Sequence, residues 1–291
     1  MTEEEYLASY DITKYDRPSI ATDIVIFSVI KKEEHNYRKD AKGHLSVLMI
    51  ERGQHPFIGQ YALPGGFMVS HETPSETATR ELYEETGIKK QSLNSFGVFG
   101  DRNRDPRGWI VSHGYMALIN AEDYRVRAGT DAWEANWFRI SVDKKSTEKI
   151  SAKAAQITEK YKLTLENDST GEVLSANLVR ERKIQKNYHE DDIYIEKSEG
   201  ISFDHAKIIL SAYLNLVDDV EKNGSIIFDF LPETFTLREL QDVAETILNR
   251  QLLVANFRRK YSNLVIEDDS YDSTVGHRPA KLFRRNLKEM L

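Results

Sequence analysis

Runs of alternating hydrophobic and polar positions in the first half of the chain predict the strands of a β-sheet. Residues 19–30 are rich in β-branched and aromatic side chains, and in residues 44–51 Leu45, Val47 and Met49 occupy alternate positions. Successive side chains of a strand point to opposite faces, and β-branched residues favour strands. Further strands are expected at residues 95–101, at Ile110–Ile119 and after residues 131–138, with the charged residues 31–43 as a hairpin loop.

A helical pattern with start and stop signals lies between Thr73 and Gly87. Thr73 is a suitable N-cap, Pro74 stands at the first helical position, and Glu76 completes a capping box. Gly87 is suited to the left-handed position that ends a helix. The sequence therefore predicts one helix between these two residues.

Residues 141–200 have a weaker pattern and are interpreted as an insertion. Apolar residues at helical spacing in 147–161 predict a helix, while residues 162–166 and 173–179 are expected to pair across a turn at 167–171. Residues 192–196 are expected to add a third strand. No site chemistry is visible in this segment, so its expected role is packing or dimerisation.

The end of the chain returns to a helical pattern. Residues 202–220 form one amphipathic stripe, and Thr236 with Glu239 makes a second capping box before another helix. Residues 254–264 predict the next helix, and residues 264–267 and 281–283 flank a loop like a β-ribbon wing. Two short helices followed by such a wing predict a helix-turn-helix.

Composition is consistent with two domains and excludes several kinds of site. At 291 residues the chain can form one domain at 1–225, which includes the insertion, and a second at 235–291. The chain has no cysteine, so thiolate metal sites and disulfides are excluded. The acidic N-terminus lacks the apolar segment of a signal peptide, and no apolar run is long enough to span a membrane. These features predict a cytoplasmic protein.

Charge is unevenly distributed between the two predicted parts. Residues 236–291 contain ten Lys and Arg against eight Asp and Glu, a balance of +2. Since the net charge of the whole chain is −7, the remaining 235 residues carry a net charge of −9. A basic tail behind an acidic body favours a contact with nucleic acid.

The helix that begins after Thr73 has an acidic face. Glu81, Glu84 and Glu85 stand at i, i+3 and i+4, so their carboxylates project from one side. Mg²⁺ prefers carboxylate oxygens and clamps phosphate groups, and Gly65 and Gly66 allow the backbone to approach a phosphate closely. The alternative is an ordinary solvated acidic helix.

The stretch 66–88 contains Gly, five residues, Glu, seven residues, Arg-Glu-Leu, one residue, Glu-Glu, one residue and Gly-Ile. This spacing resembles the Nudix box of hydrolases that split a nucleoside diphosphate linked to another group. The resemblance implies an α/β/α sandwich with a mixed sheet and a Mg²⁺ (or Mn²⁺) site at Glu81, Glu84 and Glu85. It also implies that Arg80 pairs with Glu72 to brace the loop. Glu134 is a candidate for a further ligand or general base, or else a surface residue.

A turn rich in arginine follows the acidic helix. Arg104 and Arg107 lie in Arg-Asp-Pro-Arg-Gly, and guanidinium groups match phosphate oxygens. The turn alone favours a solvated loop, but it resembles a segment of Nudix domains that recognise ADP-ribose, which favours contact with the pyrophosphate. Trp109 or Tyr115 can stack on adenine, or can belong to the core.

The tail resembles the winged helix of Nudix-related transcriptional regulators that bind ADP-ribose. The resemblance implies binding to double-stranded DNA, and the alternative is a small dimerisation domain. One winged helix makes too few contacts for tight binding, so a homodimer is expected. Arg and Asn suit base edges, and Lys and Arg suit phosphates. The candidate DNA-binding residues are Asn256, Arg258, Arg259, Lys260, Asn263, Arg278 and Lys281.

Two functions stay open on this sequence. The intact acidic motif favours a divalent-metal-dependent hydrolase, and the tail favours a non-catalytic, ligand-sensing regulator of transcription in NAD or sugar metabolism. The two functions are compatible within one chain.

Overall fold

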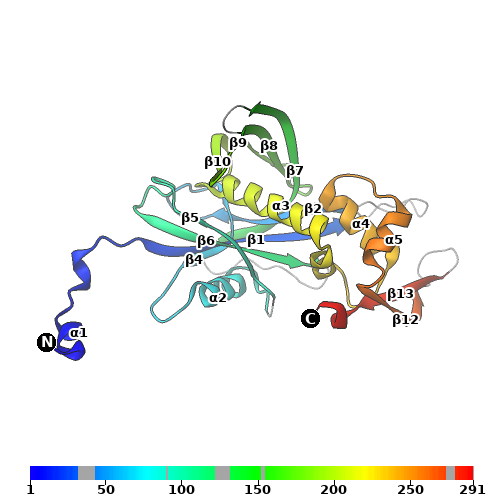
Figure 1. Cartoon of the computed structure of the whole chain (residues 1–291), viewed down its shortest axis with the longest axis horizontal. Helices are drawn as coiled ribbons and strands as arrows, with labels where there is room; N and C mark the ends of the chain where they lie inside the picture. The colour runs from blue at the N-terminus through cyan, green and yellow to red at the C-terminus, as the bar shows by residue number, and fades with distance from the viewer. Residues whose placement is uncertain (32–42, 90, 122–131, 152–154, 273–278, 291) are drawn as a thin grey trace.

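The computed structural model describes residues 1–31, 43–89, 91–121, 132–151, 155–272 and 279–290. Within these residues, ten strands form one mixed sheet, with helix α2 (Pro74–Thr86) on one face and α3 (His205–Lys222) on the other (Figure 1). The expected α/β/α sandwich with a mixed sheet is confirmed. The predicted loop at 31–43 lies almost wholly outside the described residues.

The strands of this sheet follow the hydrophobic pattern of the sequence. Their order across the sheet is β10-β9-β8-β7-β2-β1-β6-β5, with β3 beside β2 and β4 beside β1. Strands β1 and β6 pair in parallel, whereas β1 pairs antiparallel with β2 and β4. The bounds are β1 (Ser19–Lys31), β2 (Gly43–Arg52), β3 (Tyr61–Ala62), β4 (Gly65–Phe67), β5 (Asn94–Phe99), β6 (Ile110–Ile119), β7 (Ala132–Ser151), β8 (Ala155–Glu166), β9 (Val173–Gln185) and β10 (Tyr188–Glu199).

The two faces of β1 supply two separate hydrophobic cores. Ile24 and Ile26 pack into the cluster that contains Leu82 of α2. Val25 and Phe27 point to the opposite face and join the larger cluster that includes α3. Because consecutive residues of a strand face opposite sides, one continuous apolar run fastens a helix to each face. Complete burial of each such side chain contributes about 1.5–3 kcal/mol.

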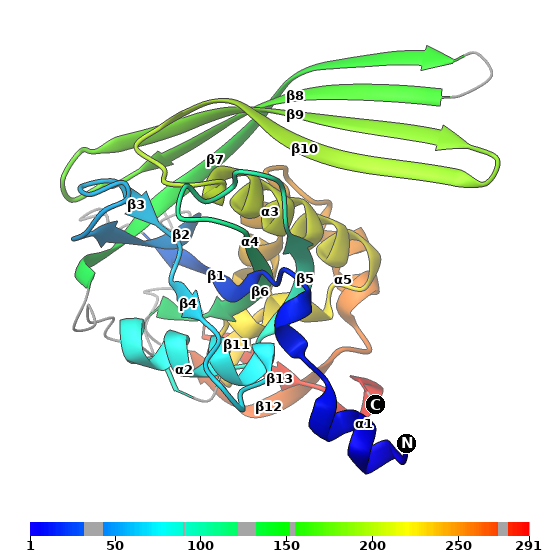
Figure 2. The same cartoon turned by 90° about the vertical axis from the view of Figure 1, so that its left-hand side faces the viewer.

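Strands β7 to β10 extend the sheet well beyond the two helices (Figure 2). The predicted helix at 147–161 is wrong, because β7 runs to Ser151 and β8 occupies Ala155–Glu166. In β8 the burial alternates, with Tyr161 and Leu163 buried and Lys160 exposed. The spacing of Ile157 and Tyr161 fits both a helix and a strand, and pairing with the neighbouring strands selects the strand.

The predicted hairpin in the insertion is confirmed. Glu166 pairs with Val173 across a turn in which Gly171 has φ 76°. The strand expected at 192–196 lies within β10, and this expectation is also confirmed. Leu178 of β9 is buried in the same cluster as α3. The base of the insertion is therefore part of the main core.

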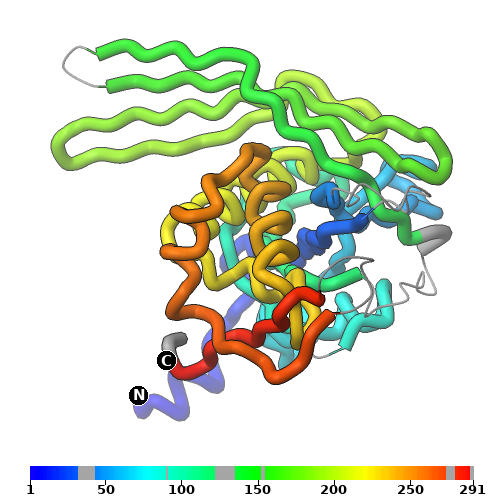
Figure 3. The backbone as a smooth tube through the Cα atoms, turned by 90° about the vertical axis from the view of Figure 1, so that its right-hand side faces the viewer, coloured from blue at the N-terminus to red at the C-terminus, as the bar shows by residue number. Residues whose placement is uncertain are grey.

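The C-terminal part forms the predicted winged helix-turn-helix, and this fold assignment is confirmed. It contains α4 (Leu237–Leu248), α5 (Val254–Tyr261) and a sheet of β11 (Phe235–Thr236), β13 (Ala280–Arg285) and β12 (Val265–Asp272) (Figure 3). Thr236 caps α4 with Glu239 as predicted. Helix α5 ends three residues before the predicted limit at 264.

Short helices complete the chain at its ends and at the junction. They are α1 (Glu3–Ser9), η1 (Ile12–Lys14), η3 (Ser225–Phe230) and η4 (Leu287–Met290). One hydrophobic cluster runs from the sheet through α3 and η3 to α4 and α5, so the domain limits at 225 and 235 stay a prediction. In the part of the chain that the structure describes, no helix is long and apolar enough to cross a membrane.

Candidate functional site

Helix α2 begins and ends as its sequence predicts. The Thr73 hydroxyl accepts a hydrogen bond from the Glu76 backbone N–H, and the Glu76 carboxylate accepts one from the Thr73 N–H. Pro74 opens the helix, and Gly87 closes it with φ 76°. These local bonds satisfy backbone groups that a helix end leaves free, and they present the acidic face of α2 to the loop at Gly65 and Gly66.

Arg80 ties this loop to the helix. Its Nε donates to Glu72 at 2.8 Å, and its Nη1 donates to Glu81 at 2.6 Å and to Glu84 at 3.1 Å. The expected pairing of Arg80 with Glu72 is therefore present. Arg80 lowers the pKa of Glu72 to about 2, because its guanidinium stabilises the ionised carboxylate.

Glu85 and Glu81 are crowded against the glycine loop. The Glu85 carboxylate accepts a hydrogen bond of 2.7 Å from the Gly65 N–H, yet burial raises the pKa of Glu85 to about 8. Burial also raises the pKa of Glu81, against the opposing effect of Arg80. A Cβ on Gly66 would stand 2.2 Å from a Glu81 carboxylate oxygen. Glycine is thus required at Gly66 for this carboxylate to occupy its place.

The carboxylates of the acidic face are suitable ligands for a hard divalent ion, but their present positions do not form a metal site. Two partly buried carboxylates beside each other favour a cation, because burial makes each resist ionisation without one. However, the described residues contain no group of three Asp, Glu, His or Cys side chains placed to hold a metal. Glu84 is bound to Arg80 and 55% exposed, so it would have to leave Arg80 to join Glu81 and Glu85. Glu134 is in β7, and its side chain lies outside the described part of the structure.

A cavity of about 170 Å³ opens beside the same glycine loop. Strands β1 and β4, the end of β2, the arginine turn and the start of α3 enclose it. Its lining residues are Ala21, Thr22, Asp23, Arg52, Ala62, Leu63, Gly65, Gly66, Phe67, Arg104, Asp105, Arg107, Ile110, Phe203 and His205. The structure thus brings both predicted arginines to the predicted glycines, although they are far apart in sequence.

Arg104 is the buried member of this group. Its guanidinium donates to Asp204 at 2.7 and 2.9 Å and to Asp23 at 3.0 Å, and 5% of its side chain is exposed. Burial would raise the pKa of Asp23, but His205 and Arg104 outweigh this effect and hold that pKa well below its usual value. Arg104 therefore bridges two acidic groups that line or adjoin the cavity, and its single charge offsets one of them.

His205 fixes the other side of Asp23. Its Nδ1 accepts a hydrogen bond of 2.8 Å from the Leu63 N–H, and its Nε2 lies 3.3 Å from the Asp23 carboxylate. Since Nδ1 is an acceptor, the ring proton is on Nε2 and points to Asp23. His205 therefore links the Leu63 backbone to the Asp23 carboxylate within the protein.

Arg107 and Arg52 also line the cavity, and both lie against aromatic rings. The guanidinium of Arg107 lies 5.1 Å from the Phe67 ring and 5.4 Å from the Phe203 ring. The guanidinium of Arg52 lies 4.8 Å from the ring of Phe203. Burial lowers the pKa of Arg52, and the charge of Arg107 lowers it further. Two neighbouring cations held on aromatic rings favour an anion between or beside them.

Sequence reasoning did not identify Arg52, Phe203, Asp23 or Asp204. Phe203 has φ 52°, an unusual conformation for a bulky residue, which is needed to hold its ring between the arginines and the start of α3. No local motif marks these residues. Of the two candidate stacking residues, Tyr115 is buried in the core, whereas Trp109 is 57% exposed.

The winged helix presents part of the predicted basic face. Asn256, Arg258 and Arg259 are exposed on α5, and Arg259 donates to Asn256 at 3.4 Å. Asn263 follows the end of α5 instead of lying on it. Lys281 lies 3.4 Å from Glu267 on the wing, and Arg278 lies outside the described residues.

Lys260 differs from Arg258 and Arg259 of α5, because its amine is bonded to backbone carbonyls of another helix. Its amine donates to the backbone carbonyls of Val220 and Glu221, at 2.7 and 2.9 Å. These carbonyls belong to the last turn of α3. The position expected for a phosphate contact is thus occupied by a contact within the protein.

Comparison with known proteins identifies two family models in this chain. The NUDIX domain matches residues 37–160, and the NrtR DNA-binding winged helix domain matches residues 227–285. The ADPR responsive transcriptional repressor NtrR of Acinetobacter baylyi is 26% identical, over 99% of this chain and 90% of its own length. The ADP-ribose pyrophosphatase of Methanocaldococcus jannaschii is 34% identical, over 45% of this chain and 69% of its own length.

Solved structures share the whole fold. A MutT/nudix family protein from Enterococcus faecalis has a TM-score of 0.66 and 24% identity, with coverage of 98% of this chain and 94% of that one. Shewanella oneidensis NrtR complexed with a 27mer DNA has a TM-score of 0.57 and 22% identity, with 92% and 93% coverage. At these identities the likeness concerns the fold alone.

Proposed function

Because the chain belongs to the Nudix family and continues into a winged helix of the NrtR type, we propose that it is a DNA-binding regulator that senses ADP-ribose. The observation that carries this proposal is the extent of the similarity to the Acinetobacter baylyi repressor, which spans 99% of this chain and therefore both domains. A hydrolase alone would not need the winged helix.

The cavity beside Gly65 has the chemistry for a diphosphate. Arg107 and Arg52 supply guanidinium groups, and Gly65 and Gly66 allow close backbone approach. Arg104 acts differently: it is buried between Asp23 and Asp204, whereas Arg107, although paired with Asp105, has 44% of its side chain exposed. We assign it the role of holding the cavity wall. The cavity of about 170 Å³ has room for only part of ADP-ribose, and we propose that the diphosphate enters it while the nucleoside stays outside.

A divalent ion would be held by Glu81 and Glu85, with Glu84 after release from Arg80. The chemistry that bound Mg²⁺ or Mn²⁺ supplies is charge neutralisation on the diphosphate and activation of water for its hydrolysis. The chain's own residues position the reacting groups: Arg80 keeps the glutamates on one face, and Gly66 makes room for Glu81.

Hydrolysis of ADP-ribose to AMP and a sugar phosphate is the second candidate function. It is favoured by the complete glutamate set on α2 and by the similarity to the Methanocaldococcus jannaschii pyrophosphatase. Purified protein with ADP-ribose and either Mg²⁺ or Mn²⁺ should release AMP, and Glu85→Gln should lower that rate by orders of magnitude. No release with either ion would leave sensing as the function.

The regulator is tested by fluorescence anisotropy on duplexes from the DNA upstream of its own gene. We expect a specific complex at low salt whose affinity changes at least fivefold with saturating ADP-ribose, the lower end of usual coupling between sites. Adenosine, which lacks the diphosphate, is the ligand control. A complex with equal affinity in the presence and absence of ADP-ribose would overturn the proposal.

A further inference from the structure

Helix α3 touches both functional regions with its two ends. Its 18 residues correspond to a length of about 27 Å, at about 1.5 Å per residue. The residues at its start line the diphosphate cavity, and its last turn is bonded to α5 of the winged helix. A rigid helix between two sites is the kind of element through which one site can affect the other.

The start of α3 is built into the cavity wall. Asp204 stands at the N-cap position but makes no capping bond, because Arg104 takes both of its carboxylate oxygens. Next to it, the single ring of Phe203 lies against the guanidinium groups of both Arg52 and Arg107. A ligand that draws these two arginines toward its phosphates changes their contacts with Phe203. Because Phe203 directly precedes the N-cap Asp204, this change reaches the first turn of α3.

The end of α3 is fastened to the recognition helix α5. The carbonyls of Val220 and Glu221 lack partners within α3, and Lys260 supplies them with one shared amine. The same region contains Gly224, where an added Cβ would stand 2.6 Å from the Tyr261 hydroxyl. A further ion pair joins Arg250 to Glu221 at 2.8 Å. Helix α5 therefore follows any displacement of the end of α3.

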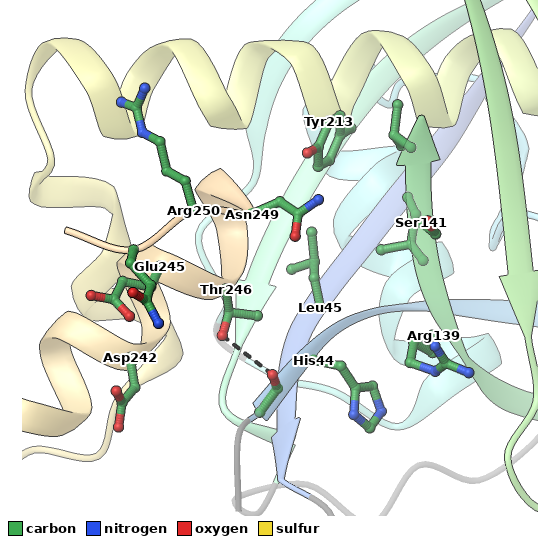
Figure 4. Close-up of a pocket in the computed structure, with 14 residues that line it drawn as sticks. His44, Leu45, Arg139, Ser141, Tyr213, Asp242, Glu245, Thr246, Asn249 and Arg250 are labelled. Atoms are coloured by element: carbon green, nitrogen blue, oxygen red, sulfur yellow. Dashed lines mark hydrogen bonds between the residues drawn. The ribbon is translucent and has the colours of Figure 1, made fainter. Parts of the chain in front are cut away.

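The junction between the sheet and the winged helix leaves room for such a displacement. A cavity of about 420 Å³ separates His44 and Arg139 of the sheet from Asn249 at the end of α4, with Tyr213 of α3 at its roof (Figure 4). Thr246 spans the gap through one hydrogen bond of 3.3 Å to the Gly43 carbonyl. This cavity leaves open space on one side of the junction, where Lys31 of β1 also reaches Glu239 of α4 at 3.1 Å.

We propose that α3 transmits the state of the diphosphate cavity to the DNA-binding helix, and that Lys260 is the positioning residue that couples α5 to α3. The inference rests on the proposed function, because it needs a ligand in the cavity and DNA on α5. It assigns Lys260 to communication between the sites and leaves the phosphate contacts to other cations, such as Arg258.

The test compares full-length wild type with Lys260→Met, and uses Arg258→Met as the matched control on the same helix. Operator affinity is measured by anisotropy with and without saturating ADP-ribose, over a range of salt concentrations. For Lys260→Met we expect the ratio of the two affinities to fall to within about twofold of unity, from a wild-type ratio in the usual range of about 5–150. Its affinity for ADP-ribose and its salt dependence should match wild type. Arg258→Met should keep the ratio but reduce the salt slope by about 1.

Three outcomes separate the possibilities. If Lys260→Met keeps the wild-type ratio and loses salt slope, Lys260 is a phosphate contact and the inference is overturned. If wild type itself does not respond to ADP-ribose, the proposed function fails and this inference fails with it. If thermal unfolding shows that Lys260→Met does not fold, Lys260→Gln replaces it, because the shorter side chain cannot reach both carbonyls. The ratio of operator affinities with and without ADP-ribose is then measured on that variant.

Discussion

Arg104 and Arg107 lie three residues apart in one turn, yet 5% of one side chain and 44% of the other are exposed. Arg104 is enclosed by Asp23 and Asp204, while Arg107 is held by Asp105 and rests on aromatic rings. The same residue type is therefore enclosed in ion pairs at one position and, in our proposal, serves recognition at the other.

Alanine substitutions should separate these two roles. Arg104→Ala removes the guanidinium from two buried carboxylates, of which Asp23 keeps His205, and should lower the free energy of unfolding by about 3–5 kcal/mol. Arg107→Ala removes the side-chain bonds to buried Asp105 but keeps the bond from the Arg107 backbone N–H, so it should lower the free energy of unfolding by less, about 1–3 kcal/mol. It should also weaken ADP-ribose binding at least about tenfold, because a charge-assisted bond contributes about 1.5–3 kcal/mol. Urea unfolding and calorimetry measure the two effects. Equal loss of stability in both variants would contradict this division.

Glu85 should make the stability of the metal-free protein depend on pH. Burial raises its folded-state pKa to about 8 from 4.5, so the folded form prefers the protonated carboxyl. The stability that this preference supplies is complete below pH 4.5 and declines as pH rises toward 8, where the buried group must ionise; at about 1.36 kcal/mol per pH unit the loss is at most about 5 kcal/mol.

Glu85→Gln, which stays neutral, should therefore be more stable than wild type at pH 9 and similar to it at pH 4.5. Unfolding is measured in EDTA at both pH values, and added Mg²⁺ should reduce the advantage of the variant by stabilising ionised Glu85 in wild type. A difference that does not change with pH would rule out this ionisation as the cause.

At the scale of elements, the base of the insertion belongs to the Nudix core. Leu178 of β9 is fully buried in the cluster that includes α3, whereas Val173 at the start of the same strand is 59% exposed. Leu178→Ala should lower the free energy of unfolding by about 2–5 kcal/mol, and Val173→Ala by no more than about 0.5 kcal/mol. Urea denaturation of both variants checks this, and a tolerant Leu178 would mean that β9 is an appended element.

The recognition helix gives a prediction about sequence preference. Arg259 is exposed on α5 beside Asn256, and arginine is suited to the edge of guanine in the major groove. Arg259→Ala should cost about 1–3 kcal/mol on the specific operator and little on a scrambled duplex. Anisotropy titrations on both duplexes provide the measurement. Equal losses on the two sequences would instead assign Arg259 to the DNA backbone.

At the scale of the whole molecule, one winged helix offers few cations to DNA. The chain has a net charge of −7, and its last 56 residues carry only +2. A single copy should therefore bind weakly, and we expect a homodimer on a palindrome whose half-sites lie about one helical turn apart. Light scattering of the complex should give two protomers per duplex. One protomer per duplex, at undiminished affinity, would contradict this arrangement.

Much of this protein follows from interactions between residues that are close in sequence. The capping box of Thr73 and Glu76, the stop at Gly87 and the spacing of Glu81, Glu84 and Glu85 are local features, so the acidic helix and its chemistry could be predicted directly. The apolar run at residues 19–30 and the period-two alternation at residues 44–51 likewise predicted two central strands. The helix expected at 147–161 failed because a short apolar pattern fits two periods, and only pairing with neighbouring strands decides between them.

The cavity, by contrast, was decided by tertiary structure. Arg104 meets Asp23 from 81 residues away and Asp204 from 100 residues away, and Arg52 reaches Arg107 only through the ring of Phe203. The sequence determined which side chains were available and which local elements carry them. Whether a given arginine is buried and neutralised, or held near a cavity mouth, depends on how distant strands and α3 pack. No periodicity or local spacing contains that information.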